Sequence, residues 1–313
     1  MIPRVSVIVP VWNRENLIIR CLDSIINQKF KPSELIIVDN GSTDNTVLAV
    51  KRFFSQYHRK GCEMILAEEK RRGAWAARQK GLELSKSDYV YFLDSDDEMN
   101  PELIELASGE IENDRNIDII CWKCRVNQLS GKKRIPPVSD RYPLEFHLIH
   151  GMLKTVGYMV KRSFIENHGG WKKQLEVWDD YELGLRLLLG KPQIRLINKV
   201  LVEIYSQKES ISGTDFKSKT GLWEKTLNEM KMYIEFRLNQ NNDYINKFLV
   251  YRETILASHY YKEGERDKGD KMMDEILFGM GIKDKIAYRM IYWYSRLGGR
   301  GAWRVLRLKD KKN

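Results

Sequence analysis

The feature that most constrains the fold is the alternation of short apolar runs with helical patterns in the first hundred residues. Four runs rich in Val, Ile, Leu and aromatic residues predict buried strands, at residues 4–12, 34–38, 62–67 and 89–93. Three helical segments are predicted between them, at residues 17–26, from about residue 47, and at 73–85. Strands that alternate with helices indicate an α/β fold, with a mostly parallel sheet flanked by helices on both faces.

Acidic residues follow three of the predicted strands. Asp39 ends the second, Glu68 ends the third, and the run Asp94-Ser95-Asp96-Asp97 ends the fourth. In open parallel sheets, ligands bind beyond the carboxyl ends of the strands. Three carboxylates within four residues repel one another unless a cation lies among them, and oxygen ligands favour Mg²⁺ or Mn²⁺. The alternative is an acidic turn before a helix that begins near Asn100-Pro101-Glu102.

Two common classes of nucleotide-binding protein are excluded by the glycine pattern. The chain has no GxxxxGK[ST] loop, and the turn after the first strand reads PVWNREN instead of GxGxxG. Asn13 in that turn is expected to cap the next helix. A P-loop enzyme or a dinucleotide dehydrogenase is therefore not expected, and a bound phosphate would have to be held by metal.

Length and cysteine usage suggest a protein of the reduced cell interior. The 313 residues suffice for one α/β domain of about 200 residues plus an appendage. No signal peptide is recognised at the start, and no run of 18 apolar residues occurs. Four cysteines are too few for a disulfide scaffold. Cys121 and Cys124 form a CxxC within a predicted strand, where they should face opposite sides, which disfavours zinc or redox chemistry.

Five segments, in this order, carry a family resemblance. They are VSVIVPVWN (5–13), IIVDNGSTDNT (36–46), GAWAARQKGL (73–82), YVYFLDSDD (89–97) and GGWKKQLEVWDDYELGLRL (169–187). Together they resemble the inverting family 2 glycosyltransferases with the GT-A fold, of the bacterial polysaccharide-assembly type. The resemblance covers about residues 4–212. It implies a catalytic domain at 1–215, made of a nucleotide-binding half (1–98) and an acceptor half (99–215).

The resemblance implies a nucleotide-sugar site and a divalent metal, Mn²⁺ or Mg²⁺. Asp39 would accept from the nucleobase ring, and Arg78 would approach the base and diphosphate. Asp96 would ligate the metal, with Asp97 in support. The other implied donor-site residues are Pro10, Val11 and Asn13 in the base pocket, and Asp94 and Ser95 near the ribose or sugar.

The resemblance also implies a catalytic base, Asp180, with Asp179 positioning either the acceptor or Asp180. The base would remove the acceptor hydroxyl proton as that oxygen attacks the anomeric carbon, and one displacement inverts the centre. The alternative is a helix N-terminus that simply favours acids.

Three positions depart from the family pattern. Arg71 replaces a common Asn, so its charge would touch an anionic ligand or face solvent. Gln207 stands where a metal-binding His is common, which weakens the expected metal affinity. Trp178 replaces a small residue, and either stacking on a sugar or core packing would explain it.

The last hundred residues predict a helical appendage, with an extension at 216–280 and a basic amphipathic tail at 281–313. The tail has ten Lys or Arg and two Asp, a net charge of +8, whereas the whole chain is +10. Its aromatic and aliphatic residues lie beside a basic stripe, which suits an anionic membrane surface. The alternative is a helix that packs its Trp and Ile on the catalytic domain. A nucleic-acid patch is a third, weaker alternative, because no binding motif accompanies the charge.

The sequence therefore predicts transfer of a sugar, by default from a UDP-sugar, to a glycan or polyprenyl-linked glycan. The expected location is cytoplasmic, peripheral on the inner face of the cell membrane. Gln207 motivates one alternative, a catalytically weak scaffold in a membrane-associated polysaccharide assembly complex. A nucleotidyltransferase is disfavoured, because PVWNREN lacks the glycine-rich loop that such an enzyme requires.

Overall fold

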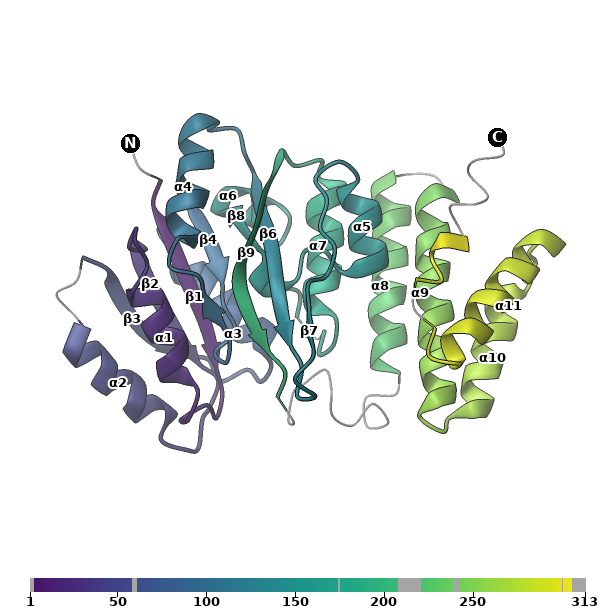
Figure 1. Ribbon diagram of the computed structural model, residues 1–313, viewed down its shortest axis with the longest axis horizontal. Coiled ribbons are helices and arrows are strands. Elements are labelled where there is room, and N and C mark those ends of the chain that lie inside the picture. The colour runs from purple at the N-terminus through teal and green to yellow at the C-terminus, as the bar shows by residue number, and fades with distance from the viewer. Residues whose placement is uncertain are drawn as a thin grey trace. The chain divides into compact units, whose positions relative to one another are not determined.

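The computed structural model describes residues 3–57, 61–173, 175–207, 221–238, 243–299 and 301–305. The chain divides into two compact units, Met1–Ser210 and Ile211–Asn313. The predictions for residues 208–212, Arg300 and residues 306–313 lie outside the described residues. The first unit is mixed α/β and the second is helical (Figure 1).

The first unit contains the predicted alternation. Its strands are β1 (Val5–Val11), β2 (Glu34–Asp39), β3 (Glu63–Glu68), β4 (Tyr89–Phe92), β5 (Glu98–Met99), β6 (Ile119–Asn127), β7 (Lys133–Arg134), β8 (Tyr158–Lys161) and β9 (Ile194–Tyr205). Its helices are α1 (Ile18–Ile26), α2 (Thr46–Tyr57), α3 (Ala74–Leu84), α4 (Leu103–Asn113), α5 (Pro143–His150), α6 (Arg162–Asn167) and α7 (Asp179–Leu189), with a 3₁₀ turn at Thr155–Gly157. The four predicted strands and three predicted helices of the first hundred residues are confirmed within one or two residues.

One sheet runs through this unit in the order β3-β2-β1-β4-β8-β6-β9-β5, and β7 pairs with β6. The first four strands in that order are parallel. Strand β8 then runs antiparallel to both β4 and β6, whereas β9 returns parallel to β6. The sheet therefore joins a parallel half to a mixed half. The short strand β7 makes a hairpin with the end of β6.

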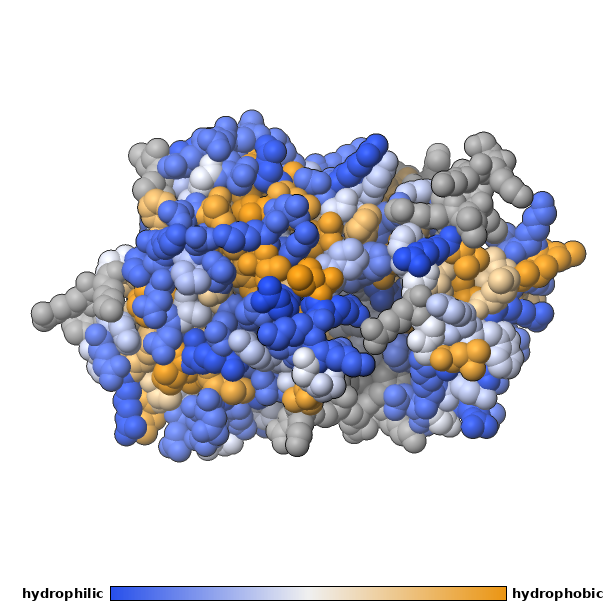
Figure 2. All heavy atoms as spheres, in the orientation of Figure 1, coloured by the Kyte–Doolittle hydropathy of each residue, from blue (hydrophilic) through white to orange (hydrophobic). Residues whose placement is uncertain are grey.

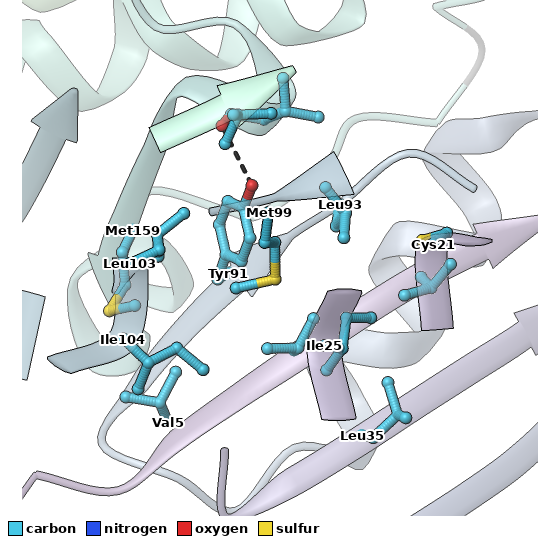
Figure 3. Close-up of a cluster of buried hydrophobic side chains, with 14 of the residues drawn as sticks. Val5, Cys21, Ile25, Leu35, Tyr91, Leu93, Met99, Leu103, Ile104 and Met159 are labelled. Atoms are coloured by element: carbon cyan, nitrogen blue, oxygen red, sulfur yellow. Dashed lines mark hydrogen bonds between the residues drawn. The ribbon is translucent and has the colours of Figure 1, made fainter. Parts of the chain in front are cut away.

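Two apolar layers cover the sheet. Alternate residues of β1 point to opposite faces, as the pleat requires. One face packs against α1 and α4, and Figure 3 shows Cys21 and Ile25 of α1 and Leu103 of α4 in this cluster. The hydroxyl of Tyr91 donates to the carbonyl of Val156 there, at 3.2 Å. The other face packs against α3 and α7.

The cysteine pair follows the pleat of β6. Cys121 lies in the layer beneath α3 and α7, and Cys124 lies in the opposite layer. Both are buried free thiols, and burial raises the pKa of each to about 12. The prediction that they face opposite sides of the strand is confirmed.

The second unit consists of α8 (Leu222–Leu238), α9 (Asp243–Lys262), α10 (Arg266–Leu277) and α11 (Ile282–Arg296). The other three helices all contact α9. The tail predicted as a separate segment therefore includes a helix, α11, that packs within this unit. Among the described residues, no helix combines the length and hydropathy that crossing a bilayer requires.

Candidate active site

The parallel register brings the predicted strand ends together. Val11 lies opposite Asp39 across β1 and β2, and Asp39 lies opposite Glu68 across β2 and β3. Leu93, directly before Asp94, donates its N–H to the carbonyl of Ile8 on β1. Acids that are far apart in sequence therefore share one edge of the sheet, as the alternation predicted.

The loops after β1 and β2 are bonded to each other. Asn13 has a left-handed backbone (φ 49°), and its side-chain oxygen accepts the N–H of Thr43 at 2.8 Å. It makes no cap for α1, because that helix begins at Ile18, so the prediction that Asn13 is a helix cap was wrong. The backbone N–H of Asn13 donates to the Ser42 hydroxyl at 3.0 Å. The sequence NGSTDNT thus serves to hold the β1 turn.

Asp39 is buried, and its carboxylate points toward the loop that follows it. Its carboxylate accepts the backbone N–H groups of Gly41 and Ser42 at 3.2 Å. Pro10 and Val11 are buried at the end of β1, and Val11 contributes its side chain to the core. The predicted base-pocket residues therefore lie around one turn, on backbone that is fixed by these bonds.

Arg71 has a structural partner. Its guanidinium makes two hydrogen bonds to Glu69, at 3.0 Å and 2.8 Å. Chiefly because of these bonds, the pKa of Glu69 falls to about 2. Asn40 ties the same loop to β2, since it donates to the carbonyls of Glu69 and Arg71 and accepts from Gly73. The extra charge at position 71 is therefore compensated within the loop.

Arg78 of α3 joins the two halves of the candidate site. Its guanidinium donates to Asp94 Oδ1 at 2.9 Å and to Asp179 Oδ2 at 2.8 Å. The side chain is only 8% exposed, and it lies 4.8 Å from the ring of Trp171. Burial lowers the pKa of Arg78, but the charges of Asp179 and Asp94 raise it by more, so the pKa lies above its usual value. A single buried cation thus links the end of β4 to the start of α7.

Asp179 and Asp180 form the first turn of α7. Helix α7 starts after Trp178, which has a left-handed backbone (φ 54°) and a ring that meets Tyr181 edge-on. Burial raises the pKa of Asp179 to about 6, and Arg78 opposes that rise. Burial also raises the pKa of Asp180, which accepts the N–H of Thr155 at 3.3 Å. Carboxylates with raised pKa values are better proton acceptors than free Asp.

A second ion pair, missed from the sequence, supports this helix. Glu182 and Arg186 lie one turn apart and are fully buried, with two contacts of 2.8 Å. Arg186 also donates to the carbonyls of His168 and Gly170, which fixes the segment that carries Trp171. The i, i+4 spacing was visible in the sequence, but only burial shows that the pair anchors a loop.

The acidic run after β4 is crowded and flanked by two arginines. Arg14 Nε lies 3.7 Å from Asp96, and Arg20 donates to the main-chain carbonyl of Asp96 at 2.6 Å. Asp97 is buried and accepts the N–H of Tyr205 at 3.0 Å. Burial and the charge of Asp94 raise the pKa values of both Asp96 and Asp97. Neither arginine was singled out from the sequence, because only the fold places the start of α1 beside this run.

The predicted metal ligands can be tested against this geometry. Within the described ranges, no cluster of three or more His, Cys, Asp and Glu side chains has a metal-binding arrangement. Gln207 donates its amide to the carbonyl of Tyr205 at 3.4 Å. The donor chemistry nevertheless fits a hard divalent ion, because Asp96 and Asp97 are oxygen ligands whose mutual repulsion a cation would relieve.

Three buried hydrogen-bond donors of this region lack a partner within the part of the chain that the structure describes. They are Arg78 Nε, Trp171 Nε1 and the Tyr158 hydroxyl. Buried donors are normally satisfied by protein, water or ligand. Their presence beside Asp179 and Asp180 is consistent with a site that binds polar ligand groups or ordered water.

The chain thus has an α/β fold of the GT-A type, followed by helices. It is similar to the S. aureus TarS fragment 1–349 crystallised with UDP-GlcNAc, with a TM-score of 0.69 at 18% identity. The match covers 95% of this chain and 92% of that one. The predicted fold class is confirmed.

Residues 6–160 match the family model "Glycosyl transferase family 2". The chain is 40% identical to Glycosyltransferase GlyA of Streptococcus pneumoniae over 108 residues, which cover 34% of this chain and 15% of the relative. It is 33% identical to the amylovoran biosynthesis glycosyltransferase AmsB of Erwinia amylovora over 169 residues, 50% of this chain and 55% of the relative. Residues 6–160 therefore form a glycosyl transferase family 2 domain, as the motifs in this part of the chain predicted. The chain spans less than two thirds of the length of either of these relatives.

Proposed function

We propose that the chain transfers a sugar, with inversion, from a nucleotide-diphosphate sugar to a hydroxyl of a glycan or lipid-linked glycan. The observation that carries this proposal is the buried bridge from Asp94 through Arg78 to Asp179. The bridge holds Asp94, which follows β4, beside the acids that begin α7. A donor bound at the strand ends would then present its anomeric carbon near Asp180.

The donor is proposed to be a UDP-sugar. The TarS fragment, similar in fold, is crystallised with UDP-GlcNAc and with UDP. Asp39 would accept from the base, with Arg78 near the base and diphosphate. The remaining donor contacts would come from residues at the ends of β1 and β4, namely Pro10, Val11, Asn13, Asp94 and Ser95.

Asp180 is the proposed base. It takes the proton of the acceptor hydroxyl as that oxygen bonds to the anomeric carbon, and the bond from that carbon to the diphosphate oxygen breaks. The nucleoside diphosphate leaves with the bonding electron pair. Asp179 is held by Arg78. The carboxylate of Asp179 accepts the backbone N–H of Asp180 at 3.0 Å, and in this way Asp179 orients Asp180. Because only one displacement occurs, the configuration inverts.

Asp96, supported by Asp97 and Gln207, would hold Mn²⁺ or Mg²⁺. Such an ion supplies, when bound, positive charge that neutralises the departing diphosphate. Arg14, 3.7 Å from Asp96, brings protein charge to the same place.

The proposed acceptor is a glycan or a polyprenyl-linked glycan of polysaccharide assembly. AmsB, which carries amylovoran biosynthesis in its name, supports this class. Because lipid-linked acceptors reside in membranes, we place the enzyme in the cytoplasm, peripheral on the inner face of the cell membrane. The basic segment 281–313 supports that location.

The test begins with the melting temperature in UDP-, GDP-, dTDP- and CMP-sugars, each with and without Mn²⁺. A ligand that binds only the folded state raises the melting temperature. Transfer is then measured on the wild type and on Asp180→Asn. A catalytic rate that falls roughly 10²–10⁴-fold, with donor binding retained, is expected for loss of the base. Undiminished transfer by Asp180→Asn would refute the assignment. No stabilisation by any donor would favour the scaffold alternative.

A further inference from the structure

Helix α11 is apolar on two opposite faces, and among the residues that the structure describes in the helical unit, only one of these faces is covered. The inner face packs on α9 and α10 through buried residues, namely Ala287, Tyr288, Ile291 and Tyr292. Two hydroxyls fix this face: Tyr288 donates to the carbonyl of Lys247 at 3.1 Å, and Tyr292 donates to Asp270 at 2.6 Å. An apolar face of a helix normally packs against a partner.

The outer face carries a continuous apolar stripe, which we call the α11 ridge. It consists of Ile282, Ile286, Met290, Trp293 and Leu297, spaced by four, four, three and four residues. Their exposed fractions run from 55% to 85%. Figure 2 shows apolar surface over α11. Scattered exposed apolar residues are ordinary, but a stripe of five on one helix marks an interaction surface.

Positive charge flanks the ridge. Lys283 and Arg289 are exposed on its two sides. Arg296, expected from the sequence to extend the basic stripe, has a side chain that is only 8% exposed, with its guanidinium 3.2 Å from the Tyr261 ring centre and 3.8 Å from that of Trp293. Arg296 therefore fixes α11 to its own unit, and the outward charge beside the ridge comes from Lys283 and Arg289.

The charge favours one kind of partner. Segment 281–313 is +8, so two copies packed through their ridges would bring like charges together, which is unfavourable. An anionic bilayer offers the complement: headgroups pair with the Lys and Arg, and the acyl boundary accepts the apolar side chains. Trp293 and Tyr294, both about half exposed, are residue types that favour the headgroup layer.

We propose that α11 lies in the plane of an anionic membrane surface, with the α11 ridge inserted to the headgroup boundary. The α11 ridge gives a physical basis for the membrane location in the proposed function. Membrane binding through the ridge does not depend on sugar transfer. The inner face of α11 stays on α9 and α10, so docking needs no unfolding of the helical unit.

The test is co-sedimentation of the full chain with phosphatidylglycerol/phosphatidylethanolamine vesicles and with phosphatidylcholine vesicles, without nucleotide sugar. Ile286→Asn/Met290→Asn removes the centre of the ridge. A matched control, Met232→Asn/Phe236→Asn, changes two apolar residues of α8 that are also four apart and are 55% and 79% exposed. Thermal unfolding establishes that every variant is folded.

We expect binding to the anionic vesicles alone, weakened roughly tenfold or more by the ridge variant and unchanged by the control. Lys283→Gln should weaken it about fivefold, and added salt should weaken it further. Absent binding by the wild type, or equal losses in both double variants, would overturn the proposal. So would a wild-type dimer in solution that the ridge variant dissociates. Because these measurements use no sugar donor or acceptor, failure of membrane binding can be distinguished from failure of the proposed reaction.

Discussion

Replacing Arg78 with Gln should destabilise the protein in a pH-dependent way. The guanidinium is 8% exposed and holds Asp94 and Asp179 at 2.9 Å and 2.8 Å. Removing one partner of a buried ion pair costs about 3–5 kcal/mol. Because Asp94 is 35% exposed and Asp179 17% exposed, solvent screens part of that loss. We therefore expect a loss of about 3 kcal/mol in the free energy of unfolding at pH 8.

The loss should shrink as the pH falls. In the wild type, burial raises the pKa of Asp179 to about 6 against the downward pull of Arg78. Without Arg78 the folded-state pKa rises further, while the unfolded-state pKa stays near 3.9. A carboxyl with a raised folded-state pKa gains stability as pH falls through that pKa. Each unit of difference between variant and wild type offsets about 1.4 kcal/mol of the loss, so about 1.5 kcal/mol or less should remain at pH 5.

Urea unfolding at pH 8 and pH 5, without nucleotide or metal, measures both values. Arg71→Gln is the matched control, since it breaks an arginine–glutamate pair in which the arginine is 49% exposed. That pair should contribute no more than about 1 kcal/mol. A loss from Arg78→Gln that is independent of pH, or no larger than that of Arg71→Gln, would refute the reasoning.

Four further predictions concern the site and two helices of the first unit. The rate of sugar transfer should fall below pH about 6 as the Asp179–Asp180 pair takes up a proton, and a flat rate profile from pH 5 to 8 would contradict this. Asp96→Ala should abolish the part of the UDP-sugar melting shift that requires Mn²⁺, and an unchanged shift would remove Asp96 from the ligand set. Gly184→Ala should cost about 1–3 kcal/mol, because the new methyl group would collide with a buried histidine ring. Gly109→Ala, in open space on α4, should instead stabilise by about 0.5–1 kcal/mol, and urea unfolding compares the two.

The sequence by itself determined the parallel half of the fold. Buried runs such as Val5–Val11 and Tyr89–Phe92 have no polar side to expose, so they indicate strands covered on both faces. Once those strands are parallel, their carboxyl ends must share an edge, so the order of strands and helices suffices to place Asp39 and Asp94 at the same edge of the sheet. The fourth strand, the acids after it and the family motifs followed from local pattern alone.

The tertiary structure determined which side chains pair with one another. Nothing local indicates that Arg78 contacts Asp179, 101 residues further along the chain, or that Arg71 is paired within its own loop. Asn13 illustrates the same limit: its residue type suits a helix cap, but the loop after β2 offered it a better hydrogen bond. The short strand β8 was also missed, since it lies outside the strand–helix alternation of the first hundred residues and joins the sheet only through antiparallel pairing with β4 and β6.

The basic tail shows most clearly which properties follow from the sequence and which follow from the tertiary structure. Its apolar and basic composition could be read from the sequence, but periodicity could not say which apolar face the protein covers. Packing on α9 buries Tyr288 and Ile291 and leaves Ile286 and Met290 outside, and it withdraws Arg296 from the basic stripe. The residue types of a segment determine which partners it can bind. Long-range packing determines which of its side chains stay exposed and available for that binding.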